Sequence, residues 1–316
     1  MRHMLSMTGY SNNLGTQDSS QARNDGPIKH FATSHLAAGS YLRRMRWLAI
    51  FLSCLLLLTT AAAPPAPVVV ERNFQRQFEQ HGVQGSFLLY EEPAGRFVAY
   101  NLKRCRQRFL PASTFKIPNT LIGLQTGALP DTAEICRWDG VKRSFPQWNQ
   151  DMTYAQALRV SCVPCYQQLA RRIGVARYRQ WLPRLGYPGM VVTPATLDTF
   201  WLDGKSQISQ FEQVDFIRRL QAGTLPVDQR RQRAVRQLLI LKKTPEYTLY
   251  GKTGWRFRSA RNPDNGWLVG WVERADGRRA FFALNIEPRP GPTNDEQFIA
   301  SRRAVTEAVL RELKWL

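Results

Sequence analysis

The chain has 316 residues, of which 43% are hydrophobic, enough to bury the core of one large domain or two smaller ones. Its formal net charge of +20 would suit a nucleic acid or an anionic surface, but the lysines and arginines are spread along the chain in short clusters. We therefore interpret them as a solvated surface and expect no nucleic-acid partner. Only one histidine, His81, follows residue 63, so a Ser-His-Asp triad has almost no candidate base and a histidine-rich zinc site is excluded.

The N-terminal residues are predicted to be a leader. A basic segment at 43–46 precedes an uncharged run at 47–63 that ends in small residues, an order that is typical of a secretory signal peptide. We expect residues 1–63 to be leader and signal peptide, and residues 64–316 to be one exported domain in the periplasm without a stable membrane span. An uncleaved N-terminal anchor is the alternative, and a start codon within the basic segment would leave residues 1–44 untranslated.

Beyond the leader, the pattern predicts strands near both ends of the chain and helices in the middle. Val68–Gly82 is predicted to be helical, because Phe74 and Phe78 are four residues apart on one face. Residues 85–90 and 97–100 are predicted to be the two strands of a hairpin. In chain order, the remaining predicted elements are helices over 113–127, 153–161, 163–173, 176–185, 210–222 and 228–238, strands over 247–254, 267–273 and 279–285, and a last helix over 296–313.

The late strands are consecutive and have short connections, so they are expected to be antiparallel. The sequence thus predicts an α/β fold of the α+β type. One antiparallel sheet is flanked by helices near the two ends, and a helical region is inserted between the early and the late strands. No linker is long or polar enough to separate independent domains beyond the leader.

Ser113 and Lys116 form an S-x-x-K motif at the start of a predicted helix. The spacing of three residues places both side chains on one face, so the amine can reach the hydroxyl. Apolar residues surround the motif, which a surface lysine does not need. A desolvated lysine can be neutral near pH 7, and such an amine could activate the serine where no histidine is at hand.

Two further triplets follow in the chain. Ser161-Cys162-Val163 lies where one predicted helix ends and the next begins, and Lys252-Thr253-Gly254 lies on a predicted strand. In the second triplet, lysine and threonine offer a cation and a hydroxyl to an anionic substrate, and the glycine lets a ligand approach the backbone closely. Each triplet alone is weak. The ordered set of S-x-x-K, S-x-V and K-T-G is strong, because penicillin-binding proteins and class A β-lactamases have the same set with S-D-N in the middle.

From about Asn73 to the C-terminus, the chain resembles the class D (oxacillinase-type) serine β-lactamases. The resemblance rests on Pro111–Asn119, Ser161–Gln167, Phe200–Gly204, Tyr250–Trp255, Gly266–Val272 and Phe282–Ile286. It implies the fold of serine β-lactamases and penicillin-binding transpeptidases, and hydrolysis of β-lactam antibiotics as the activity of the 64–316 domain. Two features depart from the family: Tyr187-Pro188-Gly189-Met190 replaces its usual Y-G-N, and Cys162 is unusual inside S-x-V.

The resemblance also implies roles for the motif residues. Ser113 would attack the lactam carbonyl, and Lys116 matches the lysine that the family carbamylates and uses as the general base of acylation and deacylation. Ser161 would relay protons to the leaving nitrogen, and Lys252 would complete the catalytic set. Carbon dioxide or bicarbonate is then the only small molecule required besides the substrate, and no metal is expected. The free Lys116 amine remains the alternative base.

The residues implied to bind or position a β-lactam are Val163, Trp201, Thr253, Gly254, Trp255, Arg302, Trp148 and Leu202. In the family, Trp201 matches a tryptophan that hydrogen-bonds the carbamate, and Arg302 helps to bind the substrate carboxylate. The N–H groups of Ser113 and Trp255 match the oxyanion hole. From the sequence alone, Trp201 could equally be a core residue and Arg302 a solvated helix residue.

Two other functions stay open. A penicillin-binding sensor or transpeptidase would be acylated without turnover, and a basic binding protein with a decayed site would not react at all.

The cysteines permit disulfides in an exported chain. Cys54 falls in the leader, and we expect a bridge between Cys105 and Cys136 that braces the helix of the nucleophile. Cys162 and Cys165 are expected to be free thiols, because a bridge within one helical turn is strained. Their C-x-x-C spacing also resembles that of redox or metal sites, but the chain has no second such pair.

Overall fold

The computed structural model describes residues 43–44, 46–47, 67–257, 264–291 and 294–316. The chain divides into two units, Met1–Pro65 and Ala66–Leu316. The predicted leader and signal peptide, including Cys54, lie almost wholly outside the described residues. Within the described ranges, no helix is long and apolar enough to cross a membrane.

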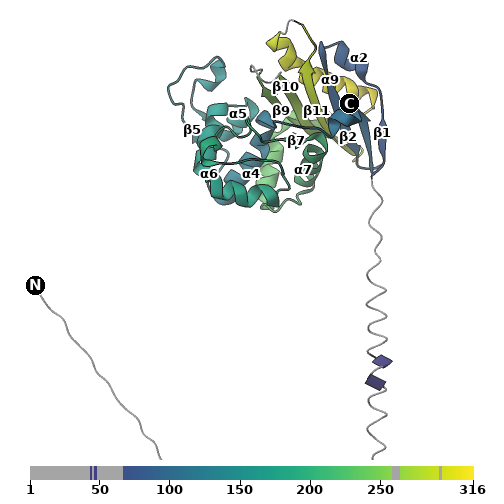
Figure 1. The fold of residues 1–316 in the computed structure, drawn as a ribbon, viewed down its shortest axis with the longest axis horizontal. Coiled ribbons are helices and arrows are strands. Elements are labelled where there is room, and N and C mark those ends of the chain that lie inside the picture. The colour runs from purple at the N-terminus through teal and green to yellow at the C-terminus, as the bar shows by residue number, and fades with distance from the viewer. Residues whose placement is uncertain (1–42, 45, 48–66, 258–263, 292–293) are drawn as a thin grey trace, which may run out of the picture. The chain divides into compact units, whose positions relative to one another are not determined.

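A seven-stranded sheet forms the centre of the second unit, with the strand order β1-β3-β2-β11-β10-β9-β8 (Figure 1). Its strands are β1 (Val69–Glu71), β2 (Val83–Glu91), β3 (Arg96–Tyr100), β8 (Ile240–Lys243), β9 (Tyr247–Arg256), β10 (Asn265–Arg274) and β11 (Arg279–Pro288). All neighbouring strands are antiparallel except β1 and β3, which are parallel. The predicted fold class is confirmed, and the sheet is mixed rather than purely antiparallel.

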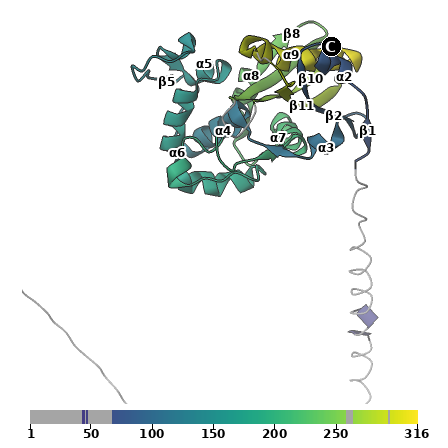
Figure 2. The ribbon, with the colours of Figure 1, turned by 45° about the horizontal axis from the view of Figure 1, so that its top comes forward.

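The helices gather on both faces of the sheet and in a region beside it, as the two views show (Figures 1 and 2). They are α2 (Gln75–Glu79), α3 (Leu102–Cys105), α4 (Lys116–Thr126), α5 (Tyr154–Arg159), α6 (Val163–Arg184), α7 (Gln210–Ala222), α8 (Gln229–Leu238) and α9 (Asp295–Glu312). Two small antiparallel pairs join β4 (Arg108–Phe109) to β7 (Ile208–Ser209) and β5 (Ile135–Cys136) to β6 (Met152–Thr153).

Alternation along the strands divides the core into two layers, because successive side chains point to opposite faces of a sheet. Phe87 and Leu89 of β2 pack with residues of α9 such as Val305, whereas Leu88 packs with the larger helical layer. Since both faces are covered, the central strand β10 is buried from Asn265 to Val272. This explains its almost continuous apolar sequence.

One predicted element differs from the structure, and some short elements were not predicted. The predicted helix Val68–Gly82 is a strand, β1, followed by the short helix α2, because the β-branched run at its start extends the sheet edge. The helices predicted over 163–173 and 176–185 are both present as the two parts of α6. They are separated by a kink at Gly174, the predicted stop, whose backbone is non-helical with φ +78°. Strand β8, a mostly exposed edge strand, was not predicted.

Candidate active site

The S-x-x-K motif lies where a turn of 3₁₀-helix, Ala112–Phe115, enters α4. Lys116 Nζ is 2.9 Å from Ser113 Oγ, so the two side chains meet as the spacing predicts. A protonated amine would donate this hydrogen bond, and a neutral amine would accept it from the hydroxyl. Ala112, just before the serine, has φ +48°, a left-handed backbone that costs a non-glycine residue energy and that often occurs at functional sites.

Lys116 is fully buried. Burial lowers its pKa to about 7, and a negative charge on the nearby Cys162 would partly oppose this shift. Nζ also lies 5.2 Å from the centre of the Tyr166 ring. A lysine with this pKa is a substantial fraction neutral at physiological pH, so it can accept a proton from its serine neighbour.

The other two motifs meet beside this pair. Lys252 Nζ donates hydrogen bonds to Ser161 Oγ and, at 2.9 Å, to the carbonyl of Thr253. Burial and the positive charges of Lys116 and Arg302 hold the pKa of Lys252 well below its usual value. Ser161 has φ +55°, a second left-handed residue next to the site. The structure thus brings together all four residues that the sequence predicted to be catalytic.

Arg302 reaches the site from α9 and is 7% exposed. Its Nη1 donates to the carbonyl of Gly254 at 2.9 Å, and its Nε donates to the carbonyl of Ile299 at 3.0 Å. Burial lowers the pKa of Arg302 to about 10. It is therefore not a solvated helix residue. Together with Lys116 and Lys252, it places three basic side chains at the base of the site.

Ser113, Ser161 and Arg302 border a cleft of about 420 Å³. Its lining residues are Ser113, Phe145, Trp148, Ser161, Val163, Leu202, Thr253, Trp255, Arg256, Phe257, Ile299 and Arg302. The sequence did not predict Phe145, Arg256, Phe257 and Ile299. Two of these extend an aromatic wall, since the ring centroids of Phe145 and Trp148 are 4.4 Å apart and those of Trp255 and Phe257 are 3.9 Å apart.

Proteins with a similar sequence or structure identify the family. Residues 73–311 match the penicillin-binding protein transpeptidase domain. The chain is 39% identical to β-lactamase OXA-48 of Klebsiella pneumoniae over 243 residues, 77% of this chain and 88% of that protein. It is 35% identical to β-lactamase OXA-10 of Pseudomonas aeruginosa over 216 residues, 68% and 80% of the two chains.

Two solved structures extend the comparison. The class D β-lactamase YbXI from Nostoc superposes with a TM-score of 0.72 at 42% identity, over 77% of this chain and 99% of that one. The class D β-lactamase of Sebaldella termitidis gives 0.73 at 31% identity, over 79% and 100%. The chain belongs to the class D β-lactamases.

Two residues that the class D resemblance assigned to the site lie just behind the cleft. Trp201 is fully buried and stacks on Phe115, with ring centroids 5.7 Å apart. Its indole N–H has no hydrogen-bond partner among the described residues. Gly254 packs so closely on the turn of the nucleophile that a Cβ there would lie 3.1 Å from the carbonyl oxygen of Pro111.

The class D departure at Tyr187–Met190 does not reach the cleft. Tyr187 is buried in the helical layer, where its hydroxyl is 3.2 Å from Gln213 Oε1. Gly189 has φ +74° and faces the carbonyl of Gln207. None of these four residues is among the described lining of the cleft.

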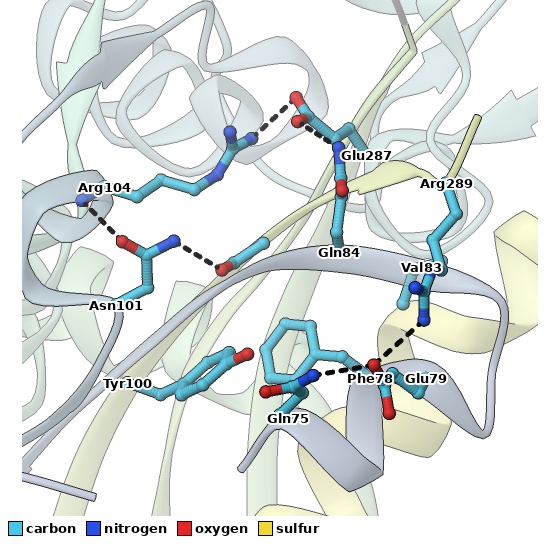
Figure 3. A pocket seen from close by; sticks show the side chains of 11 residues that line it. Gln75, Phe78, Glu79, Val83, Gln84, Tyr100, Asn101, Arg104, Glu287 and Arg289 are labelled. Atoms are coloured by element: carbon cyan, nitrogen blue, oxygen red, sulfur yellow. Dashed lines mark hydrogen bonds and ion pairs between the residues drawn. The ribbon is translucent and has the colours of Figure 1, made fainter. Parts of the chain in front are cut away.

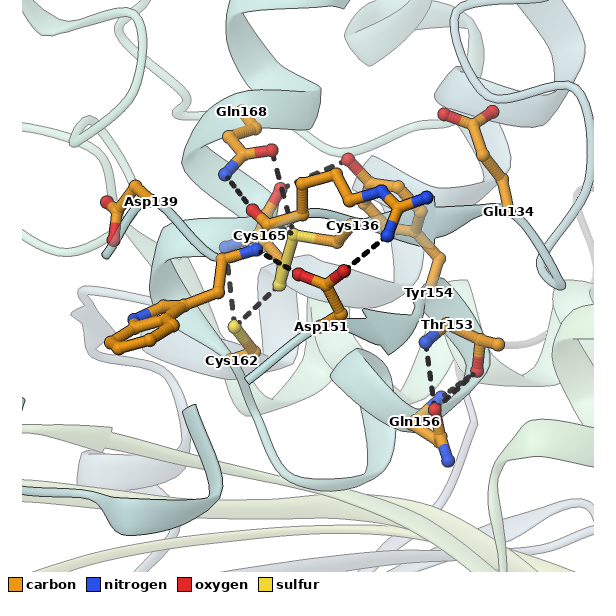
Figure 4. The surroundings of a disulfide bond; sticks show 12 residues. Glu134, Cys136, Asp139, Asp151, Thr153, Tyr154, Gln156, Cys162, Cys165 and Gln168 are labelled. Carbon is orange, nitrogen blue, oxygen red and sulfur yellow. Dashed lines mark hydrogen bonds and ion pairs between the residues drawn. A yellow bond between two sulfur atoms is a disulfide. The ribbon is translucent and has the colours of Figure 1, made fainter. Parts of the chain in front are cut away.

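The predicted disulfide is wrong. Cys136 is bonded to Cys165, with Cα atoms 5.7 Å apart (Figure 4), and Cys105 and Cys162 are free. The β5–β6 pair brings Cys136 to the first turn of α6, a contact between segments that local sequence patterns do not reveal. Cys105 instead lies against the carbonyls of Phe87 and Tyr100, and burial raises its pKa to about 12. Of the two cysteines predicted to be free, only Cys162 is.

A second hollow, of about 400 Å³, lies beside α2 and β2, away from the three motifs (Figure 3). Its charges are paired within its own lining. Arg104 Nη2 is 3.0 Å from Glu287 Oε2, and Arg289 Nη1 is 3.2 Å from Glu79 Oε1. Within the described ranges, no group of three or more histidine, cysteine or acidic residues could hold a metal ion.

Proposed function

We propose that the chain hydrolyses β-lactams through a covalent acyl-enzyme on Ser113, with Lys116 as the base. The observation that carries the proposal is the pairing of a fully buried lysine, whose pKa is about 7, with a serine hydroxyl 2.9 Å away. The relatives named above are β-lactamases, and the cleft size suits a small substrate.

In the proposed acylation, Lys116 takes the proton of Ser113 as its Oγ attacks the lactam carbonyl. The backbone N–H groups of Ser113 and Trp255 stabilise the oxyanion that forms. When the C–N bond breaks, Ser161 delivers a proton to the leaving nitrogen, and Lys252 restores it through their hydrogen bond. Arg302 and Thr253, with Lys252, hold the substrate carboxylate by charge-assisted hydrogen bonds.

Five residues have binding roles in this proposal. Val163 packs beside Lys116, and Gly254 admits the substrate close to β9. Trp201 donates a hydrogen bond to the carbamate that we propose for Lys116 in the next paragraph. Trp148 and Leu202 contact the substrate side chain across the cleft that they line.

We further propose that carbon dioxide carbamylates Lys116. The surroundings fit this group, because a neutral amine is required and the buried indole N–H of Trp201 is without a partner in the described structure. None of the groups that shift the pKa values of Lys116 and Lys252 is a carboxylate. A carbamate anion on Lys116 would therefore be stabilised by the neighbouring basic groups, Lys252 and Arg302. The carbamate would supply a carboxylate base for both acylation and deacylation, and the three motifs otherwise lack a carboxylate.

The remaining parts of the proposal concern export. Residues 1–63 are proposed to be removed as leader and signal peptide, leaving the catalytic domain 64–316 in the periplasm with the β-lactam as its partner. N-terminal sequencing of the exported protein should find a start near residue 64, whereas an uncleaved anchor would leave the preceding segment in place.

A chromogenic cephalosporin tests the reaction. The purified protein should turn it over many times, and activity lost in carbon-dioxide-free buffer should return with bicarbonate. A single stoichiometric burst would indicate a sensor or transpeptidase instead, and no reaction would indicate a decayed site. Activity indifferent to bicarbonate would favour the free amine as the base. The control is Ser113→Ala, which should fold but form no acyl-enzyme by mass spectrometry.

A further inference from the structure

Three sulfur atoms meet next to the S-x-V motif of the active site. Cys136 and Cys165 form the disulfide, and Cys162 Sγ lies 2.7 Å from Cys165 Sγ (Figure 4). All three side chains are buried, with exposures of 1 to 3%. A free thiol is thus held within reach of one particular sulfur of a disulfide, with little access for outside reagents.

The third cysteine also begins a helix. Cys162 is the N-cap of the first part of α6, before the kink at Gly174, and its Sγ accepts a hydrogen bond from the Cys165 N–H at 3.4 Å. Helix N-termini stabilise thiolates, and a Cys-x-x-Cys pair at such a position is the arrangement of many redox-active dithiols. Burial raises the pKa of Cys162, and the positive charges of Lys116 and Arg143 partly offset this effect.

We propose that Cys136, Cys162 and Cys165 form a thiol–disulfide exchange site in which two bridges interchange. The Cys162 thiolate attacks Cys165 Sγ, the bond between Cys165 and Cys136 breaks, and a Cys162–Cys165 bridge forms. Cys136 leaves with the electron pair and takes up the proton that Cys162 lost. The step is an isomerisation, so it requires no oxidant or reductant.

The exchange would act on the cleft. The present bridge ties β5 to α6, and the segment between β5 and β6 carries Phe145 and Trp148 of the aromatic wall. After exchange, the covalent tie joins Cys162, a non-helical N-cap, to the first turn of α6, so it is not a bridge inside a helical turn of the kind that the sequence predicted to be strained. The segment between β5 and β6 then keeps only non-covalent contacts, such as the bond from Trp148 Nε1 to the Val160 carbonyl. Cys162 itself lies between Ser161 and Val163, so the new bridge constrains the S-x-V motif.

A peptide map reveals which bridge is present. Trypsin is expected to release residues 117–137, which contain Cys136, and residues 160–171, which contain both other cysteines. The present bridge links the two peptides, whereas the exchanged bridge lies inside the second peptide and leaves Cys136 free for alkylation. After hours of incubation, native wild-type protein quenched in acid and alkylated should contain both forms. If every molecule retains the linked peptides with Cys162 alkylated, the proposal is wrong.

Variants trap each form. Cys162→Ser should contain only the linked peptides, and Cys136→Ser should form the bridge between Cys162 and Cys165. If folded, air-oxidised Cys136→Ser has two free thiols at Cys162 and Cys165, the proposal is wrong. Cys105→Ser is the control and should match the wild type, because Cys105 lies apart from the cluster against Phe87 and Tyr100. If Cys136→Ser fails to fold, the peptide map of the wild-type protein still tests whether the two bridges interchange.

The functional effect is measured separately. Cys136→Ser should have a KM for β-lactams with large side chains that is severalfold above that of Cys162→Ser, because the aromatic wall is no longer tied to α6. An equal KM would overturn the link to the cleft. This measurement rests on the proposed function, but the peptide map does not, so failure of one can be distinguished from failure of the other.

Discussion

Arg302 and Arg303 are adjacent on α9 but lie in different surroundings. Arg302 is buried beneath β9 and holds the Gly254 carbonyl, whereas Arg303 is exposed and forms a 2.7 Å ion pair with Glu307. An exposed ion pair contributes little to the stability of the fold, because water screens the attraction between its charges. A buried guanidinium beside a cleft can instead pair with an anionic ligand.

The pair offers a matched comparison of substrate binding. Arg302→Ala should lower kcat/KM about 10- to 100-fold, mainly through KM, because a charge-assisted bond to the substrate carboxylate is worth about 1.5–3 kcal/mol. Arg303→Ala should change kcat/KM less than about twofold. Steady-state kinetics on a penicillin, with melting temperatures of both variants, check this. Equal small effects would assign Arg302 to the fold alone.

At this scale, the sequence predicted the polar centre of the site better than its walls. Ser113 and Lys116 are joined by helical geometry, so their contact follows from spacing. The contact of Lys252 with Ser161 followed only from the family resemblance, since 91 residues separate them. Phe145 and Phe257 were missed, although Phe257 lies two residues after Trp255, which places both on one side of an extended chain. The partner of Cys165 depends on tertiary packing and has no local signal.

At the scale of elements, the nucleophile depends on β9. Strand β9 passes against the 3₁₀ turn Ala112–Phe115, and a Cβ at Gly254 would be crowded by this turn. A Cβ there would also lie 3.2 Å from Thr114 Cγ2 and 3.2 Å from Trp267 Cβ. This packing fixes the distance between the K-T-G strand and the serine.

Gly254→Ala tests this dependence. The added methyl group should push the turn by a few tenths of an ångström and lower kcat about tenfold or more, because reacting groups tolerate little displacement. The melting temperature should fall only modestly, since overpacking of this size costs about 1–3 kcal/mol. Kinetics and thermal unfolding of one preparation provide the check. Full kcat with a lowered melting temperature would mean that β9 supports the fold without positioning Ser113.

The elements that the sequence predicted well are those with strong periodicity and clear ends. Helix α7 begins at Ser209 with a capping box to Glu212 and ends at Gly223 in the left-handed conformation, close to its predicted bounds. Strand β1 was missed because three extended residues at a sheet edge depend on their neighbour β3 rather than on their own pattern. The kink of α6 at Gly174 was predicted, because the glycine is a stop signal and the helical dihedrals break at that residue.

At the scale of the whole molecule, distant parts of the sequence meet at the site. Strand β2 pairs with β11, and the cleft draws residues from Ser113 to Arg302. This assembly buries Lys116, Lys252 and Arg302, and the charges of Lys116 and Arg302 disfavour the charged form of Lys252. A site with these basic groups suits an anionic substrate. Burying the groups, however, lowers the stability of the fold.

Because burying the charged form of Lys116 destabilises the folded protein, its stability should depend on pH. The pKa of Lys116 is about 7 in the folded protein. In the unfolded chain, the ordinary lysine value of 10.5 is expected. Between these values the unfolded chain binds more protons, so this lysine makes the free energy of unfolding rise with pH across that window. Below the folded pKa the lysine is charged in both states, and the full penalty, a few kcal/mol at about 1.4 kcal/mol per pKa unit, applies.

Lys116→Met removes the charge and keeps an unbranched apolar chain. In carbon-dioxide-free buffer, the variant should be more stable than the wild type at pH 7 by roughly a few kcal/mol, and the difference should shrink as the pH approaches 10. Urea unfolding at several pH values measures this, and titration of other groups cancels in the comparison. Lys243→Met, exposed on β8, is the control and should show a small difference that pH does not change. A Lys116→Met protein less stable than wild type at pH 7 would mean that the buried amine stabilises the fold, and the argument for a neutral, reactive lysine would fail with it.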